Sequence, residues 1–384
     1  SSFGHGYGAQ EGVWECPDLM ELPVRGTDRT KWVLICNINP GGPFGGSAAQ
    51  YFVGDFDGKT FTCDTKPEVT KWMDYGKDHY AAVSWSNTPE KRHTVIAWMS
   101  NWQYANNVPT KQFRSANTLP RDIELYEGSD GELYLAATPA PEVNALRTGK
   151  ALKYGAFSAG TKKVSRKLPV ENSGICEINL ELAPRSADKV YITLSNDKDE
   201  QTVMTYDLRN STFSMDRTAS GLTDFNKDFP AITVAPCPAE AKQRLRLFID
   251  RCSIEAFEGD GRFAMTNLVF PQHPYTTISI AVDKGRLVAK FTETRLGRAL
   301  NYWCYHGLGF DALYDIVFVK PFLLIGKLLK SDPVDKIWNV LPMVSLVGNR
   351  VTTWFESGSV RGYAASFGFG MAVLLVLVMM MIGK

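Results

Sequence analysis

The sequence lacks an excess of charge of either sign. Its 384 residues contain 42 Lys and Arg against 41 Asp and Glu, which gives a formal net charge of +1. Nucleic-acid-binding proteins carry a basic patch, because the phosphate backbone is recognised through charge. The closest candidate is the short run Thr161–Lys167, which we interpret as a solvated linker face. We therefore expect no nucleic-acid partner.

Metal-binding spacing is also lacking. The seven cysteines stand at positions 16, 36, 63, 176, 237, 252 and 304, with no Cys-x-x-Cys pair, and no two of the five histidines are four residues apart. These patterns favour buried free thiols and exclude a zinc motif or a disulfide framework. No nucleotide-binding loop is present, so we expect neither a metal nor a cofactor.

No secretory leader can be read at the start of the sequence either. The chain begins at Ser1 without a charged and then apolar segment, and we expect its first residue to lie inside a domain. A chain of this length usually folds as two or three domains.

Residues 1–140 contain short β-favouring runs separated by Gly, Pro, Asn and Asp. Lys31–Ile38 is one such run, and Asp57-Gly58 is a hairpin turn signal because both positions tolerate a positive φ. Strands at this spacing favour a sandwich or a propeller. We interpret the polar, Lys-rich residues 141–173 as a connection.

Residues 174–296 again alternate between apolar and polar positions. Val190–Leu194, Leu245–Asp250 and Ser253–Phe257 have the period of two that is typical of strands. Turn residues separate these strands, so this region is expected to form a β-sandwich.

One carboxylate near the start of the chain suggests chemistry. Glu15 lies between Trp14 and Cys16, and Pro17 ends the run. Burial against an apolar wall can give a glutamate the pKa of a general acid. The alternative is that Glu15 begins or ends a strand on a solvated face, and this short run leaves both interpretations open.

The surrounding blocks extend this signal. Gly12–Leu19 is followed, in order, by Tyr51–Phe61, Met73–Ala82, Ile96–Ala105 and Arg114–Arg121. The ordered series resembles glycoside hydrolase family 32, the invertases, levanases and inulinases that cleave β-fructosyl bonds. The resemblance covers roughly residues 1–296.

The resemblance implies a mainly β fold. The family has a five-bladed β-propeller followed by a β-sandwich, and residues 1–140 suffice for about three blades of four strands each. We therefore expect a partial propeller at 1–140 and a sandwich at 174–296, with the first blades missing.

The resemblance also assigns site residues. Glu15 would be the acid/base, Asp74 and Lys77 would hydrogen-bond sugar hydroxyls, and Trp98 would stack on a sugar ring. Asp74 and Lys77 could instead form an ion pair in a surface turn, and Trp98 could be a core residue. Trp102 and Tyr104 are expected to be structural.

The second catalytic group of the family has no match. A retaining glycosidase needs two carboxyl groups about 5 Å apart. The family's nucleophile is an Asp in a Trp-Met-Asn-Asp-Pro-Asn-Gly motif that does not occur here, and residues 1–14 contain no Asp. Asp122 is followed by Ile123, which does not match the family's Arg-Asp-Pro motif. We therefore expect almost no hydrolysis of sucrose, inulin or levan by this chain.

The composition changes at about Gly297. Tyr363–Ile382 carries no charge and is long enough for a helix to cross a hydrocarbon layer about 30 Å thick. Residues 297–384 resemble the C-terminus of subunit L of respiratory complex I, through Gly309–Asp311, Leu313–Asp315 and Val317–Phe322.

This second resemblance implies a lateral amphipathic helix and then a transmembrane helix at 363–382. Asp311 and Asp315 would lie on the polar face of the amphipathic helix. We expect the chain to be membrane-associated through this tail, whereas the glycosidase part alone would be soluble.

Three hypotheses follow. The first is a truncated family 32 β-fructosidase joined to an unrelated membrane tail, with a fructose-containing oligo- or polysaccharide as its partner. The second is a membrane-tethered module that binds fructan without cutting it. The third and weakest is a fragment of a respiratory membrane subunit, because one crossing helix cannot form a proton channel. The junction near Gly297 has no linker, which also fits a recombined reading frame.

Overall fold

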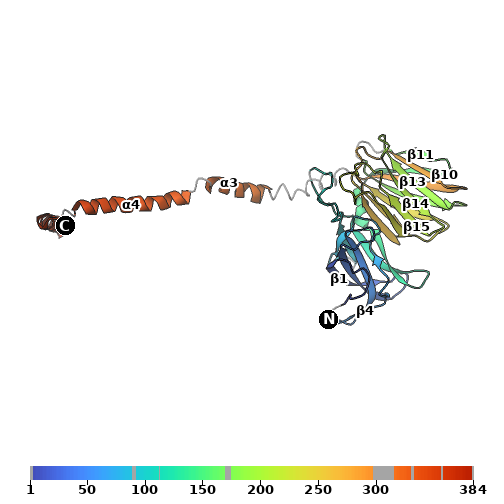
Figure 1. Ribbon diagram of the computed structural model, residues 1–384, viewed down its shortest axis with the longest axis horizontal. Coiled ribbons are helices and arrows are strands. Elements are labelled where there is room, and N and C mark those ends of the chain that lie inside the picture. Colours follow the sequence, from blue (N-terminus) through green and yellow to red (C-terminus); the bar gives the residue numbers. More distant parts are fainter. Residues whose placement is uncertain are drawn as a thin grey trace. The chain divides into compact units, whose positions relative to one another are not determined.

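The computed structural model describes residues 3–88, 92–111, 113–168, 174–296, 315–329, 333–355 and 358–382. The chain divides into two compact units, Ser1–Gly297 and Arg298–Lys384, which are described separately. The first unit is built of strands and the second of helices (Figure 1).

The first part of the β unit contains two antiparallel sheets. One has the order β1-β2-β3-β4, with β5 paired to β3, and the other has the order β6-β7-β8-β9. Their bounds are β1 Val13–Pro23, β2 Thr30–Asn39, β3 Ala48–Phe56, β4 Phe61–Cys63, β5 Lys71–Trp72, β6 Tyr80–Ser84, β7 Thr94–Trp98, β8 Arg121–Glu127 and β9 Leu133–Pro139. The described part of residues 1–140 thus forms two sheets, where about three blades were expected from the residue count.

The predicted turn at Asp57-Gly58 joins β3 to β4. Gly58 has a φ of +90°, and the Asp57 carboxylate accepts the backbone N–H groups of Lys59 at 2.7 Å and Thr60 at 2.6 Å. The side chain therefore replaces part of the backbone pairing at the tip of the hairpin.

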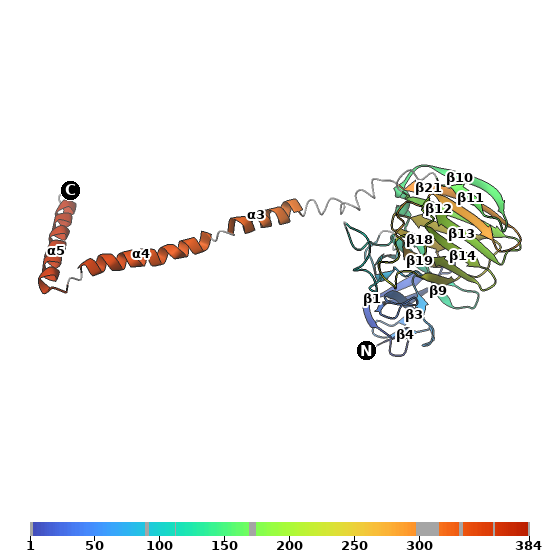
Figure 2. The same cartoon turned by 45° about the horizontal axis from the view of Figure 1, so that its top comes forward.

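Residues 147–296 form a sandwich of two six-stranded sheets. Their orders are β10-β21-β12-β17-β18-β19 and β11-β20-β13-β14-β15-β16. Figure 2 shows strands of both layers, with β12, β18 and β21 in one and β13 and β14 in the other. The bounds are β10 Arg147–Ala159, β11 Val164–Lys167, β12 Cys176–Pro184, β13 Lys189–Ser195, β14 Gln201–Asp207, β15 Thr212–Asp216, β16 Ile232–Pro236, β17 Gln243–Ile249, β18 Ser253–Glu258, β19 Phe263–Leu268, β20 Thr277–Val282 and β21 Leu287–Leu296.

The alternation of apolar residues explains the sandwich. Ile178 and Leu180 on β12 and Leu247 on β17 point between the sheets and are almost fully buried, while the residues between them point outward. The prediction of a β-sandwich fits these two stacked sheets.

The interpretation of residues 141–173 as a connection is wrong for most of its length. A short 3-10 helix, Pro141–Leu146, leads into β10, which pairs with β21, while β11 pairs with β20. The segment is polar because both strands lie at sheet edges, where most side chains face solvent.

The second unit is helical. It contains a π-helix at Asp315–Val319, α3 at Lys320–Leu329, α4 at Pro333–Phe355 and α5 at Val360–Ile382. The expected lateral helix is thus divided into two α-helices, and α5 begins before the predicted Tyr363. Asp311 and the side chain of Asp315 lie outside the described residues.

Among the described residues, α5 is the one helix long and apolar enough to cross a membrane. It is 23 residues long and none of its residues is buried within the protein. Ser359 precedes the helix, and its hydroxyl accepts the backbone N–H of Gly362 at 3.4 Å.

Candidate functional site

Glu15 lies on β1 at an irregularity of the strand. The pairing of β1 with β2 shifts register between Glu15 and Asp18, and Cys16 has a φ of +46°. Neighbouring residues of a strand point to opposite faces, so the Trp14 ring stacks on Phe52, with 5.3 Å between centroids, while Glu15 is exposed. The idea that Trp14 forms an apolar wall over Glu15 is therefore wrong.

Tyr80 is the partner of Glu15. It lies at the start of β6, it is buried, and its hydroxyl donates a hydrogen bond to the Glu15 carboxylate Oε2. Burial, together with this hydrogen bond and the nearby Glu15 charge, raises the pKa of Tyr80. The phenol therefore stays protonated and acts as a donor at neutral pH.

Asn37 fixes β6 against the irregular part of β1. Its side chain is fully buried and its Oδ1 accepts the backbone N–H of Ala82 at 2.9 Å. Its Nδ2 donates to the carbonyls of Ala82 at 3.3 Å and Cys16 at 3.4 Å. One amide thus holds the backbones that carry Glu15 and Tyr80.

Two tryptophans extend this group. Trp98, at the end of β7, meets the Tyr80 ring edge to face with 6.2 Å between centroids, and it lies 4.9 Å from the Trp102 ring. Trp98 is half-buried and Trp102 is 52% exposed. We call Glu15, Tyr80, Trp98 and Trp102 the Glu15 cluster. It presents a carboxylate to solvent, linked through Tyr80 to an accessible aromatic surface.

Asp74 lies elsewhere, between the first part and the sandwich. It is 3% exposed, and its Oδ2 pairs with the Arg121 guanidinium at 2.7 Å. Its carboxylate also accepts the backbone N–H of Thr266 at 2.8 Å and that of Gly76 at 2.7 Å. The Arg121 guanidinium also forms an ion pair with Glu255 of β18 at 2.8 Å.

Lys77 is also buried, and its ammonium donates to the backbone carbonyl of Asp228 at 2.6 Å. The next residue, Asp78, forms a fully buried ion pair with Arg217 at 2.5 Å, and the Tyr104 hydroxyl donates to Asp78 at 2.6 Å. Asp78 also accepts the backbone N–H of Leu268 at 2.8 Å. We call the Asp74–Arg121–Glu255 and Asp78–Arg217–Tyr104 networks, together with the buried neighbours Lys77 and His79, the polar joint.

The polar joint shifts the protonation of its members. Burial would raise the pKa of Asp74, but the Arg121 charge and hydrogen bonds hold it below its usual range. Burial and the Arg121 charge lower the pKa of His79 to about 4. Burial and the Arg217 charge also lower the pKa of Lys77. The Asp74 carboxylate and the Lys77 ammonium bond to protein groups rather than to solvent, whereas the buried Nδ1 of His79 has no hydrogen-bond partner among the described residues.

The structure therefore separates the four predicted site residues into two groups. Glu15 and Trp98 lie in one accessible cluster, whereas Asp74 and Lys77 lie in the buried joint and contact the sandwich. Sequence reasoning missed Tyr80, Asn37 and the exposure of Trp102. Tyr80 and Trp102 stand inside two of the blocks quoted above, but nothing in the sequence indicated that they share a site.

Comparisons with known proteins agree with the division of the β unit. Residues 1–137 match the model of the glycosyl hydrolases family 32 N-terminal domain, and residues 142–296 match the model of the family's C-terminal region. A levanase of Bacillus subtilis (strain 168) is 39% identical over 298 residues, which cover 76% of this chain and 43% of the levanase.

Two solved structures are similar to this chain over the same share of its length. A crystal structure of exo-inulinase from Aspergillus awamori superposes with a TM-score of 0.68 and 31% identity, covering 76% of this chain and 58% of that one. A β-fructofuranosidase from Schwanniomyces occidentalis complexed with fructosyl-erythritol gives a TM-score of 0.66 and 28% identity, covering 76% and 61% of the two chains. The chain thus spans about half the length of these relatives. The resemblance of residues 297–384 to complex I subunit L gains no support from these comparisons and stays an expectation.

Proposed function

Residues 1–137 and 142–296 belong to glycosyl hydrolase family 32, and we propose that they form a β-fructosidase scaffold with Glu15 as its acid/base. The substrate would be the terminal fructosyl unit of sucrose, inulin or levan. The observation that carries the proposal is the Glu15 cluster, where an accessible carboxylate and two accessible indoles are joined through Tyr80.

The cluster supports both binding and proton transfer. An indole face packs well against the apolar side of a furanose ring, so Trp98 and Trp102 would orient the sugar. The Glu15 carboxyl group would protonate the glycosidic oxygen as the C–O bond breaks, and its carboxylate would later take a proton from water. Tyr80 would hold Glu15 in position, since its hydroxyl donates to one carboxylate oxygen.

Asp74 and Lys77 would act at a distance from the sugar. Their functional groups already bond to Arg121, Thr266 and the carbonyl of Asp228. We propose that they position the loop between β5 and β6, which leads to Tyr80 at the start of β6, and do not themselves touch substrate.

The reaction needs a second carboxyl group near Glu15. Asp122 does not supply it, because its carboxylate is engaged by Arg92 at 2.9 Å and Thr94 at 2.6 Å. Among the described residues, the side chain that bonds to Glu15 is Tyr80. We therefore propose that this 384-residue polypeptide binds fructosyl units and hydrolyses them at a very low rate.

The two sheets of residues 13–139 support a partial propeller. In β1-β2-β3-β4 and in β6-β7-β8-β9, four consecutive strands form an antiparallel meander, which is the form of a propeller blade. We propose that β1–β5 and β6–β9 are two blades of the family's propeller, and that Glu15 and Trp98 come from different blades.

An alternative function has an observation of its own. The apolar helix α5 carries no buried residues, and a helix of this length can span a bilayer. The chain could therefore be a membrane-tethered fructan-binding module without catalysis. The third hypothesis, a complex I subunit fragment, has only the unsupported resemblance of the tail.

Fructan binding and fructose release test the two functions together. The full chain, in a detergent without sugar groups, is mixed with sucrose, inulin or levan, and bound and hydrolysed sugar are measured. The β-fructosidase scaffold predicts binding that Trp98→Ala weakens. If the chain binds sugar without turnover, and Glu15→Gln leaves that binding unchanged, the tethered module is favoured. Absence of any binding contradicts both, and rapid turnover by the unmodified chain contradicts the proposed loss of hydrolysis.

A further inference from the structure

A groove of about 580 Å³ lies against the sandwich sheet β10-β21-β12-β17-β18-β19. This volume falls within the usual range for ligand sites. The turn residues Gly259–Gly261 and the end of β9, at Thr138 and Pro139, line one side of the groove. Its lining includes no member of the Glu15 cluster, so it is a separate site.

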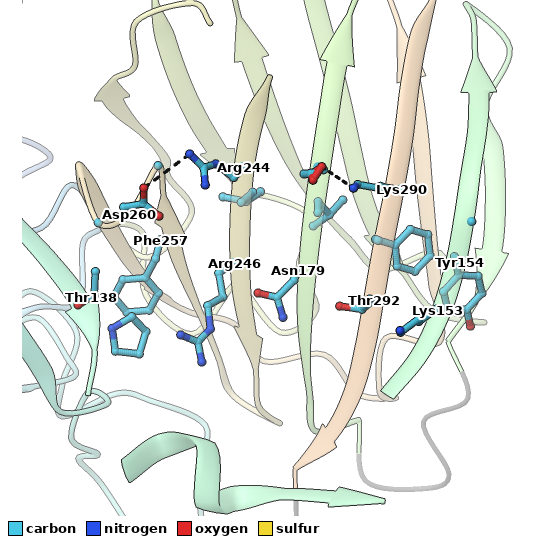
Figure 3. Close-up of a pocket in the computed structure, with 18 residues that line it drawn as sticks. Thr138, Lys153, Tyr154, Asn179, Arg244, Arg246, Phe257, Asp260, Lys290 and Thr292 are labelled. Carbon is cyan, nitrogen blue, oxygen red and sulfur yellow. Dashed lines mark ion pairs between the residues drawn. The ribbon is translucent and has the colours of Figure 1, made fainter. Parts of the chain in front are cut away.

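A row of polar side chains crosses this sheet at one register. Lys153 of β10 pairs with Thr292 of β21, which pairs with Asn179 of β12, which pairs with Arg246 of β17. Figure 3 shows these side chains in line across the strands, with Phe257 at the end of the row. The neighbours of Asn179 and Arg246, and Phe291 beside Thr292, point into the sandwich core, so these three side chains face outward. Lys153 pairs with Thr292 and so lies on the same face.

The row offers unused hydrogen-bonding groups. Within the described part of the chain, the side chains of Lys153 and Thr292 make no hydrogen bond, and Asn179 uses only its Nδ2, which donates to Glu177 at 2.9 Å. The Asn179 carbonyl oxygen, the Thr292 hydroxyl and the Lys153 ammonium can therefore all serve a ligand.

Arg246 is a rigid member of the row. Its Nε donates to the buried Glu177 carboxylate at 2.8 Å and its Nη2 donates to Asn144 at 3.1 Å. Its guanidinium also lies over the Phe248 ring at 4.7 Å. A group held from three sides loses little freedom when a ligand binds.

Three of the four cations that line the groove already have anionic partners, and Lys153 is the exception. Lys290 pairs with Glu181 at 2.7 Å and Arg244 with Asp260 at 3.6 Å, as Figure 3 shows, while Arg246 is paired with Glu177. An anionic ligand would have to compete with these carboxylates. A neutral ligand rich in hydroxyl groups would not, because hydroxyls both donate and accept.

The length of the row indicates the size of that ligand. Neighbouring strands lie about 4.8 Å apart, so three strand steps from Lys153 to Arg246 span roughly 14 Å. We propose that this row binds a short neutral oligosaccharide, laid across the strands, at a site separate from the Glu15 cluster. The proposed function contributes only the choice of a fructan as the first sugar to test.

Binding of a linear inulin pentamer to the full chain, measured by calorimetry in a detergent without sugar groups, tests the proposal. Thr292→Val keeps the shape of the side chain and removes its hydroxyl, and combining it with Asn179→Ala should weaken groove binding about tenfold, since each lost hydrogen bond costs a few-fold in affinity. Thr205→Val, on β14 of the other sheet, is the matched control and should leave binding unchanged. Raising the salt concentration to about 0.5 M should also leave it unchanged, because screening acts on charge.

Trp98→Ala separates the two sites. If the proposal holds, Trp98→Ala leaves the groove component intact, and the combined Thr292→Val and Asn179→Ala substitutions weaken it about tenfold. Binding lost in Trp98→Ala but unchanged by the groove substitutions overturns the groove while the proposed function stands. The reverse pattern supports the groove and contradicts sugar binding by the Glu15 cluster. Strong weakening by salt, or no binding of the pentamer at all, also overturns the proposal.

Discussion

The Glu15 cluster and the polar joint use the same residue types in opposite ways. Glu15 is exposed and has one bonded side-chain partner, Tyr80, among the described residues. Asp74 and Asp78 are almost fully buried, and each bonds to an arginine and to at least one backbone N–H group. A carboxylate with free lone pairs can exchange a proton with a ligand. One whose lone pairs are filled by fixed donors holds two parts of the chain together.

Removing an arginine from the polar joint should have the largest effect. Arg217→Ala leaves Asp78 buried without its counter-charge, which typically costs about 3–5 kcal/mol. We expect the free energy of unfolding, measured with urea, to fall by that amount. Arg209→Ala, whose exposed side chain pairs with Asp188 at the surface, serves as the control and should cost less than about 1 kcal/mol. Similar losses for the two variants would contradict the distinction.

Acid should weaken the joint through His79. The pKa of buried His79 in the folded chain is about 4, below the ordinary value of 6.5. Between pH 6.5 and pH 4, the unfolded chain therefore binds a proton at His79 that the folded chain does not bind. Stability should therefore fall as the pH drops from 6.5 to 4, by up to about 3 kcal/mol for this buried group. Asp74 acts in the same direction, because its pKa is also lowered and its contribution is lost in acid.

Unfolding measured from pH 7 to pH 4.5 isolates the histidine. His79→Gln should make the decrease smaller. Burial lowers the pKa of His93 as well and raises the pKa of the Glu258 carboxyl to about 7, but both groups titrate in the variant as they do in the unmodified chain, so the difference between the two profiles belongs to His79. An unchanged pH profile in this variant would show that protonation of His79 does not lower the free energy of unfolding.

The aromatic part of the Glu15 cluster should affect binding more than stability. Trp98→Ala removes a face on which a sugar ring can stack, and an aromatic contact is worth about 1 kcal/mol, or roughly fivefold in affinity. Calorimetry with sucrose measures this loss. Trp85→Ala, which removes another accessible indole outside the cluster, should leave the affinity unchanged.

Glu15 itself should contribute least to stability. Glu15→Gln keeps the size of an exposed side chain, so we expect the free energy of unfolding to change by less than about 0.5 kcal/mol. A loss of several kcal/mol would place Glu15 with the structural carboxylates and break the comparison.

Much of the fold could be predicted because its signals are local. The Asp57-Gly58 turn, the alternation in β12 and β17 and the uncharged run of α5 each depend on neighbouring residues. The polar segment 141–173 was harder, because an edge strand exposes both faces and so loses its alternation.

The site was less predictable because its contacts are long-range. Glu15 meets Tyr80 across 65 positions, and Asp74 meets Thr266 across 192. The resemblance to family 32 placed Glu15 and Trp98 in one site before any contact was known. It also placed Asp74 and Lys77 there, and the sequence had no signal for their burial against the sandwich.

Chemical rescue with azide tests most directly whether Glu15 is an acid/base group. Azide can attack the anomeric carbon of the fructosyl unit of sucrose while the bond to the glucosyl oxygen breaks and Glu15 donates its proton to that oxygen, so the products are fructosyl azide and glucose. Glucose release by the full chain is measured with and without azide. We predict azide-dependent release that Glu15→Gln abolishes. Equal release by the unmodified chain and by Glu15→Gln, or no release at all by a chain that binds sucrose, would contradict the assignment.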